Sequence, residues 1–154
     1  INGSGDWLCN TDYTYFFGEL NPRSTTKLTL IDCSFDGNSL PVLIEIIHLP
    51  NLSTIIAHNC NFPEDSVEEI FKHEDYAKLE FIDCTFYRKP KERGPDGKII
   101  DHDKDDEDIL LANCLTDCDL LQELTFIRCG LSIKAIRILR GITVNGIRIA
   151  NIEN

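Results

Sequence analysis

The sequence lacks methionine, long apolar runs and clustered basic residues, and each absence limits what the protein can be. Because none of its 154 residues is Met, we expect a fragment of a longer protein or a processed chain. No stretch approaches the roughly 18 uninterrupted apolar residues of a membrane span, and no charged-then-apolar leader opens the chain, so no membrane segment is predicted. The net charge of −11 and the single short basic run argue against nucleic acid as a partner, because phosphate binding requires clustered Lys and Arg.

Catalytic motifs are also missing. The sequence has no Gly-rich phosphate loop and no Ser-centred elbow. Its four histidines fall at unrelated positions, namely His48, His58, His73 and His102. We therefore predict that the chain is not an enzyme and that it carries no cofactor and no metal.

Seven cysteines are present, and an odd number argues against a complete disulfide framework. Four of them recur at equivalent places in a repeated pattern, which favours a reducing compartment and therefore the cytoplasm or nucleus. Two glycosylation tripeptides, beginning at Asn2 and Asn51, would suit a secreted protein, so a secreted effector remains an alternative.

The repeated pattern is the most informative feature of the chain. "KLTLIDCSF" at 27–35 returns as "KLEFIDCTF" at 78–86. Aligned on cysteine, the copies are Leu28-x-Leu30-x-x-Cys33-x-Phe35, Leu52-x-x-Ile55-x-Ala57-x-x-Cys60-x-Phe62, Tyr76-x-x-Leu79-x-Phe81-x-x-Cys84-x-Phe86, Leu121-x-x-Leu124-x-Phe126-x-x-Cys129-x-Leu131 and Ile147-x-Ile149-x-x-Ile152. The intervals between the cysteine positions, with Ile152 in the place of Cys, are 27, 24, 45 and 23 residues, so the long interval must hold an insertion or a missed repeat.

Each copy predicts a short strand with one face inward, because its apolar residues alternate. The following Cys is small enough to enter the core, where its weak S–H donor can meet backbone carbonyls. Between the copies the apolar period becomes helical, which predicts a helix behind each strand. The residues expected on the buried helix faces are Leu40, Leu43, Ile44 and Ile47, then Val67, Ile70 and Phe71, and finally Ile133, Ile136 and Leu139. The fold class predicted is α/β.

The pattern resembles that of the leucine-rich repeat family, L-x-x-L-x-L-x-x-N/C-x-L, over most of the chain. This resemblance, closest to the ribonuclease-inhibitor-like and cysteine-containing subtypes, implies a right-handed solenoid with short parallel strands on a concave face and helices on the convex face. It assigns 27–154 to about five repeats. The aromatic-rich segment 1–26 does not fit the repeat and is predicted to be an N-terminal cap or flanking segment, with a partner-docking motif as the alternative.

An insertion is predicted at 87–108, where a basic half is followed by an acidic half without any core pattern. We expect a surface loop. Its Asp101-x-Asp103-x-Asp105 spacing resembles a calcium loop, but Asp106 stands where Gly is needed and Ala112 stands where the closing Glu is needed. A solvated charge run is therefore favoured, with a cation-responsive module as the alternative.

The variable positions of the repeat predict the binding surface. They form three columns on the concave face, which are Thr29, Ile56, Glu80, Thr125 and Arg148, then Ile31, His58, Ile82, Ile127 and Ala150, and then Asp32, Asn59, Asp83, Arg128 and Asn151. Exposed isoleucines flanked by acidic residues are typical of a surface that binds a basic and apolar protein partner. The alternatives are that Ile is simply a good strand former or that a flanking domain covers it.

The function expected is a non-catalytic protein–protein interaction module that binds its partner through the concave face. A scaffold or assembly subunit would have the same repeats, and examples are a substrate receptor of a ubiquitin ligase, a respiratory-complex assembly factor or a microbial effector. A catalytic or regulatory role in an attached domain is a further alternative.

Overall fold

The structure is a computed structural model that describes residues 8–9, 23–35, 39–63, 66–72, 75–87, 92–100, 107–142 and 149–154. Its strands are β1 (Leu8–Cys9), β2 (Lys27–Ile31), β3 (Thr54–His58), β4 (Asn61–Phe62), β5 (Lys78–Ile82), β6 (Thr85–Phe86), β7 (Glu123–Ile127) and β8 (Ile149–Glu153). The helices of the described part are α2 (Leu40–Ile47), α3 (Ser66–Phe71), α4 (Glu107–Leu115) and α5 (Ile133–Ile142).

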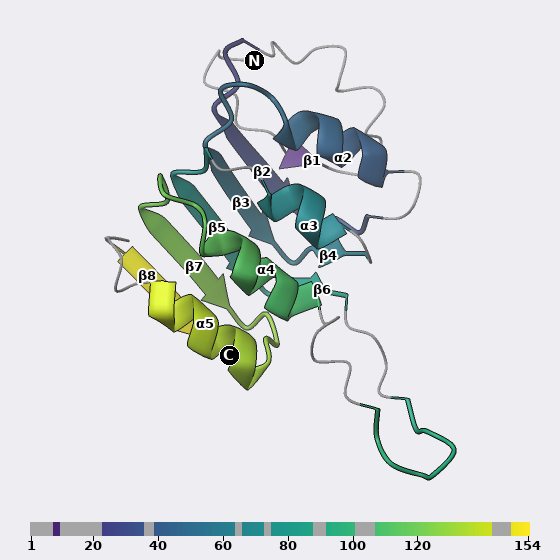
Figure 1. The fold of residues 1–154 in the computed structure, drawn as a ribbon. Coiled ribbons are helices and arrows are strands. Elements are labelled where there is room, and N and C mark those ends of the chain that lie inside the picture. The colour runs from purple at the N-terminus through teal and green to yellow at the C-terminus, as the bar shows by residue number, and fades with distance from the viewer. Residues whose placement is uncertain are drawn as a thin grey trace.

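The chain forms one six-stranded sheet with the order β1-β2-β3-β5-β7-β8, and every neighbouring pair is parallel. Figure 1 shows the four helices side by side on one face of this sheet. A helix lies between each successive pair of long strands in the chain, as parallel strands require. The predicted α/β class and the predicted parallel strands are therefore confirmed.

The core lies between the sheet and the helix layer. Each of the four strands β2, β3, β5 and β7 alternates half-buried and buried side chains over five residues. The buried set is Leu28, Leu30, Ile55, Ala57, Leu79, Phe81, Leu124 and Phe126, as the alternation predicts. Behind each strand the helices contribute residues such as Leu43, Ile70, Leu111 and Leu139.

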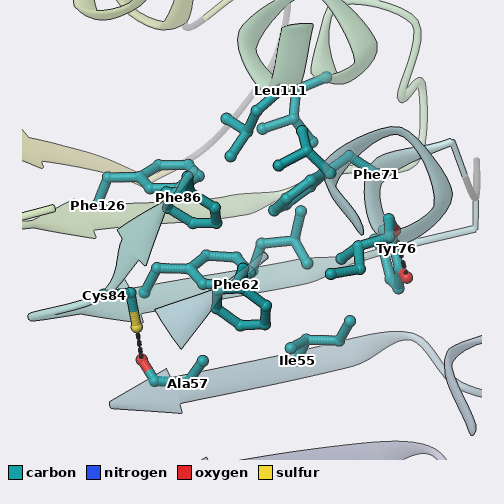
Figure 2. Close-up of a cluster of buried hydrophobic side chains, with 14 of the residues drawn as sticks. Ile55, Ala57, Phe62, Phe71, Tyr76, Cys84, Phe86, Leu111 and Phe126 are labelled. Atoms are coloured by element: carbon teal, nitrogen blue, oxygen red, sulfur yellow. Dashed lines mark hydrogen bonds between the residues drawn. The ribbon is translucent and has the colours of Figure 1, made fainter. Parts of the chain in front are cut away.

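A second layer of packing follows the strands, where the chain pairs again through β4 and β6. Three phenylalanines stack here, with ring centroids 5.4 Å apart for Phe35 and Phe62 and 5.3 Å apart for Phe62 and Phe86. Figure 2 shows Phe62, Phe86 and Phe126 within this cluster. The final aromatic of the repeated pattern thus fills the same place in successive units.

The cysteines of the repeat are buried, as predicted, and each thiol donates to a backbone carbonyl. Cys84 is fully buried and its Sγ lies 3.2 Å from the carbonyl oxygen of Ala57 on the neighbouring strand (Figure 2). The Sγ of Cys129 lies 3.4 Å from the carbonyl oxygen of Phe81. Cys33 and Cys60 donate to the carbonyls of Ile31 and His58. The small polar group is therefore satisfied within the core.

The strands also begin in the same way. The carbonyl of Thr26 accepts the N–H groups of Ser53 and Thr54, at 3.0 and 3.1 Å. The carbonyl of Ser53 does the same for Ala77 and Lys78, and that of Ala77 does so for Gln122 and Glu123. One carbonyl thus sets the register of the next strand in three successive units.

The predicted alignment of the fifth copy is wrong by three residues. It placed Ile152 opposite Cys129, whereas the register pairs Ile152 with Phe126. Because Ile149 and Ile152 are both apolar, the pattern alone could not separate the two registers. The backbone decides, since the N–H of Arg128 donates to the carbonyl of Glu153 at 2.8 Å.

The side chain of Asn154 links β8 to the segment that follows β7. The side chain of Asn154 accepts from the N–H of Leu131 at 3.1 Å and donates to the carbonyl of Leu131 at 2.8 Å. Such a side-chain contact depends on the register, so the alignment could not anticipate it.

The predicted buried face of α5 is also partly wrong. Ile133 was expected to be buried but is 71 % exposed, whereas Ala135, Leu139 and Ile142 are buried. The Oγ of Ser132 accepts the N–H of Ala135 at 3.1 Å, and this cap starts the helix so that Ala135 and Leu139 turn inward.

The predicted insertion ends earlier than expected. Glu107 and Asp108 were assigned to the loop but open α4, and both are buried. Within the insertion, residues 92–100 form a hairpin, in which Gly94 donates to Lys98 and Ile100 donates to Glu92, each at 2.8 Å. Figure 1 shows this hairpin away from the sheet. The remainder of the insertion and nearly all of the segment 1–26 lie outside the described residues.

Candidate functional site on the outer face of the sheet

The face of the sheet turned away from the helices is called the outer face here, and it carries the residues predicted to bind a partner. The parallel register aligns them in two rows across the strands. The first row is Thr29, Ile56, Glu80 and Thr125, and the second row is Ile31, His58, Ile82 and Ile127. Neighbours in a row are on adjacent strands, about 4.8 Å apart in the hydrogen-bonding direction.

All eight side chains of these rows are half-buried, although no helix of the described part covers them. Adjacent strands shield each one laterally. The structure therefore brings together, on β2, β3, β5 and β7, the residues of the first and second predicted columns. At the β8 end the rows continue with Asn151 and Glu153, which replace the predicted Arg148 and Ala150. Arg148 itself lies outside the described residues.

Apolar side chains form two patches on the outer face. Ile82 and Ile127 are direct neighbours on β5 and β7, while Ile31 and Ile56 lie diagonally on β2 and β3. His58 lies between Ile31 and Ile82 in the second row, but Ile56 lies diagonally next to both, so the two patches are continuous through Ile56 in the register.

A polar contact joins the middle strands at this point. His58 Nε2 lies 2.8 Å from Glu80 Oε1, with the His58 side chain 41 % exposed and the Glu80 side chain 23 % exposed. Glu80 therefore has a hydrogen-bond partner within the face. The sequence pattern predicted both residues for the surface but not their contact, since it did not establish the diagonal geometry.

The third predicted column forms the turn that ends each strand. Asp32, Asn59, Asp83 and Arg128 all have positive φ, between 51° and 55°. Their N–H groups still donate to the last residue of the next strand, as that of Asp32 does to the carbonyl of His58 at 3.0 Å. This left-handed conformation is uncommon outside Gly, Asn and Asp, so Arg128 is the unexpected member.

The side chains of these turns are paired. Asn59 Nδ2 donates to Asp32 Oδ1 at 2.6 Å. Arg128 binds Asp83 with two parallel contacts of 2.6 and 2.7 Å, and its guanidinium lowers the pKa of Asp83. The same contact raises the pKa of Arg128. Two of the acidic residues predicted to flank the isoleucines, Asp32 and Asp83, are therefore already paired with Asn59 and Arg128.

Sequence reasoning missed the residues at the start of the strands. Lys78 Nζ lies 2.8 Å from Glu123 Oε2, and this hydrogen bond raises the pKa of Lys78. Lys78 and Glu123 are paired in the register and both are more than a third exposed. Their shared position immediately before the first inward Leu was the signal that could have identified them.

The acidic residues, histidines and cysteines are the side chains that could form a metal-binding group. Among the described residues, no group of three or more His, Cys, Asp or Glu could hold a metal ion. Of the acidic run at 101–108, residues 101–106 lie outside the described ranges. Asp108 is buried, and its Oδ2 accepts the N–H of Ser132 at 2.6 Å.

The pKa shifts of the buried cysteines of the repeat differ in direction, because a hydrogen bond with Cys60 lowers the pKa of Cys84. Burial raises the pKa of Cys129 to about 12. Hydrogen bonds with Cys33 and Cys84, together with burial, raise the pKa of Cys60. Because the thiolate is the reactive form of cysteine, the raised pKa values make the thiols of Cys60 and Cys129 less reactive than exposed thiols.

No helix in the described part is long and apolar enough to span a membrane. Comparisons of the chain with protein-family models, curated proteins and solved structures gave no match.

Proposed function

We propose that this protein is a non-catalytic protein–protein interaction module that binds its partner through the outer face of the sheet. The observation that carries the proposal is the pair of half-exposed isoleucine patches, Ile31 with Ile56 and Ile82 with Ile127, on a face that no described helix covers. Apolar surface of this kind gains free energy when a partner removes it from water.

The composition around the patches supports a partner with a basic and apolar surface. Acidic residues outnumber basic ones at the described positions of the outer face and its turns. The acidic ones are Asp32, Glu80, Asp83, Glu123 and Glu153, and the basic ones are Lys27, Lys78 and Arg128. An apolar centre with a charged rim is the usual arrangement of a protein interface.

We further propose that the units are leucine-rich repeats and that they stack as a solenoid. The support is the recurrence of one geometry, in which a five-residue strand is followed by a left-handed residue, a buried Cys and an apolar residue. Proteins of that family mostly act by binding other proteins, which agrees with the proposed use of the outer face.

We also propose that the protein resides in a reducing compartment, which is the cytoplasm or nucleus. Six of the seven cysteines, those from Cys33 to Cys129, are free thiols, and five of these six are buried. Free thiols persist where the glutathione pool keeps them reduced.

The experiment is a comparison of captured proteins with a double variant, Ile82→Arg with Ile127→Arg, and a control, Asn113→Arg. Asn113 is exposed on α4 in the helix layer, so the control adds an arginine on the opposite side of the molecule. Both variants are first shown to be folded by circular dichroism and thermal melting. The captured proteins are then identified, purified and titrated directly.

We expect a purified partner to bind the wild-type protein and Asn113→Arg equally and to lose most of its affinity for the double variant. Equal affinity for all three proteins would contradict the proposal.

A further inference from the structure

The charge of the chain is distributed unevenly along its length. Residues 124–154 contain five of the 15 basic residues and one of the 26 acidic residues, so this segment has a net charge of +4. The preceding 123 residues have a net charge of −15. The segment from 124 to 152 contains no acidic residue at all. A basic end on an acidic protein points to a partner of opposite charge.

Much of this positive charge lies on α5. The helix contains Lys134, Arg137 and Arg140, all exposed, and no acidic residue. Arg137 makes no hydrogen bond or ion pair with any described residue. Arg140 is directed toward the sheet edge, because its Nη2 lies 3.5 Å from the carbonyl oxygen of Ile152 in β8. The cations thus lie on the outside of the last helix in the layer.

Apolar surface accompanies these cations. Ile133 is 71 % exposed, which is the highest exposure among the large apolar residues of the described part. Ile136 and Ile138 are only half-buried against the core. Basic and apolar side chains alternate on this helix, whereas a phosphate-binding surface needs charge and hydrogen-bond donors but gains little from exposed isoleucine.

The neighbouring strand offers a place for a partner's backbone. β8 is the last strand in the sheet order, so within the described residues only its β7 side is paired. An edge strand presents N–H and C=O groups that a further strand can bind. α5 packs on α4 and on β8, so the edge of β8 and the helix belong to the same end of the molecule (Figure 1).

We propose that α5, together with the edge of β8 that no described strand pairs, is a second docking surface, separate from the outer face, for an acidic and partly apolar polypeptide of a partner protein. Glutamate or aspartate side chains would pair with Arg137, and apolar side chains would cover Ile133. A second copy of this chain docked through the same surface is disfavoured, because it would bring two basic helices together.

The test uses a fluorescent peptide of alternating Glu and Leu as the acidic, apolar probe. A peptide of alternating Lys and Leu and a single-stranded oligonucleotide serve as comparison probes. Binding is measured by fluorescence anisotropy at low ionic strength and again at high ionic strength. The variant is Lys134→Glu with Arg137→Glu, and the matched control is Arg93→Glu with Lys98→Glu on the hairpin at 92–100, where both cations are exposed.

We expect the Glu–Leu peptide to bind the wild-type protein and the control with equal affinity and to bind the α5 variant about tenfold more weakly. Added salt should lower the affinity of the peptide for the wild-type protein. Amide hydrogen exchange should slow in α5 and β8 when the peptide binds. The proposal is overturned if the peptide does not bind, if both variants bind it equally, or if protection falls on β5 and β7 instead. Equal or tighter binding of the oligonucleotide, or of the Lys–Leu peptide, would also overturn it.

Discussion

At the scale of the residue, the backbone satisfies two of the buried polar side chains, Cys84 and Tyr76. The thiol of Cys84 meets the carbonyls of Ala57 and Ile82, at 3.2 and 3.4 Å. The fully buried Tyr76 hydroxyl donates to the carbonyl of Ile70 at 2.8 Å, and burial raises its pKa. Without these contacts the buried polar groups would be unpaired, and each would lower the free energy of unfolding by about 1–3 kcal/mol.

Replacement of Cys84 by Ala should therefore destabilise the protein by about 1–2 kcal/mol, because it removes the Sγ contacts and leaves a small cavity. Denaturant titration measures this change. Cys114→Ala is the matched control, since Cys114 is half-buried on α4, and its substitution should stay within about 0.5 kcal/mol of the wild-type protein. Equal stability of both variants would show that the thiol contacts contribute nothing.

Arg128→Gln should return the pKa of Asp83 to the ordinary range of an aspartate. The guanidinium lowers this pKa, so the pair contributes to stability above the ordinary carboxyl pKa, and the contribution is lost as the pH falls through the lowered value. Carboxyl NMR titration follows Asp83 directly. An unchanged pKa in the variant would mean that the bidentate contact does not persist in solution.

At the scale of the element, the turn after each strand repeats most closely. Asp32, Asn59, Asp83 and Arg128 adopt nearly the same positive φ, yet three different residue types occupy the position. Asn and Asp tolerate this conformation better than other residues with a Cβ. The turn therefore favours Asn and Asp. Arg128 is the exception, and its side chain binds Asp83.

Asn59→Val should cost about 2 kcal/mol more than Asn59→Gly, because both substitutions remove the hydrogen bond to Asp32 but only Val opposes the positive φ. Thermal or urea unfolding of the pair isolates the backbone effect. Similar stability of the two variants would indicate that the turn relaxes to negative φ.

The repeated elements could be predicted from the sequence, because one short pattern gives the positions of the strand, of the buried Cys and of the apolar residue that follows it. Alternation identified the inward residues of the strands, such as Leu79 and Phe81, and cysteine alignment identified the column of thiols. The register of β8 could not be predicted, because Ile149 and Ile152 fit the pattern equally well. The start of α5 is fixed by the cap of Ser132 on Ala135 and also by the contact of Ser132 with Asp108, which is 24 residues away and has no signal in the repeat pattern.

The candidate site was predictable only in part for a similar reason. The columns of the outer face follow from spacing within each unit, so Ile31, Ile82 and Ile127 were found. Charge pairing depends on contacts between units. The pairs His58–Glu80 and Asp83–Arg128 join residues 22 and 45 positions apart, and a pattern within one unit carries no information about them.

At the scale of the whole molecule, the described hairpin of the insertion contributes little to the core. Residues 92–100 are exposed except for Gly94, which is half-buried, and Gly97 supplies the positive φ of 76° at the hairpin turn. Tyr87 and Glu107 bracket the insertion and belong to the packed body, because Tyr87 donates to the carbonyl of Phe62 and Glu107 is buried.

Replacing residues 88–106 by a flexible Gly-Ser linker of about eight residues should leave the unfolding midpoint nearly unchanged. Shortening an exposed loop changes the closure entropy by only about 0.6 kcal/mol for each halving of length. Calorimetry of the full chain and the shortened chain tests this expectation. A large loss of stability would mean that the insertion packs on the body.

The order of the strands in the sheet matches their order in the chain, so each unit contacts mainly the units before and after it. The hairpin at 92–100 lies between β6 and α4, and a cut there would separate α4 from the strands β5 and β6 of the same unit but would leave every strand whole. The two pieces would each retain complete strands, and β5 and β7 would form the only strand pairing of the described sheet that has to be restored. The chain is therefore suited to be expressed as two separate polypeptides that reassemble, and a bound partner spanning β5 and β7 would favour their reunion.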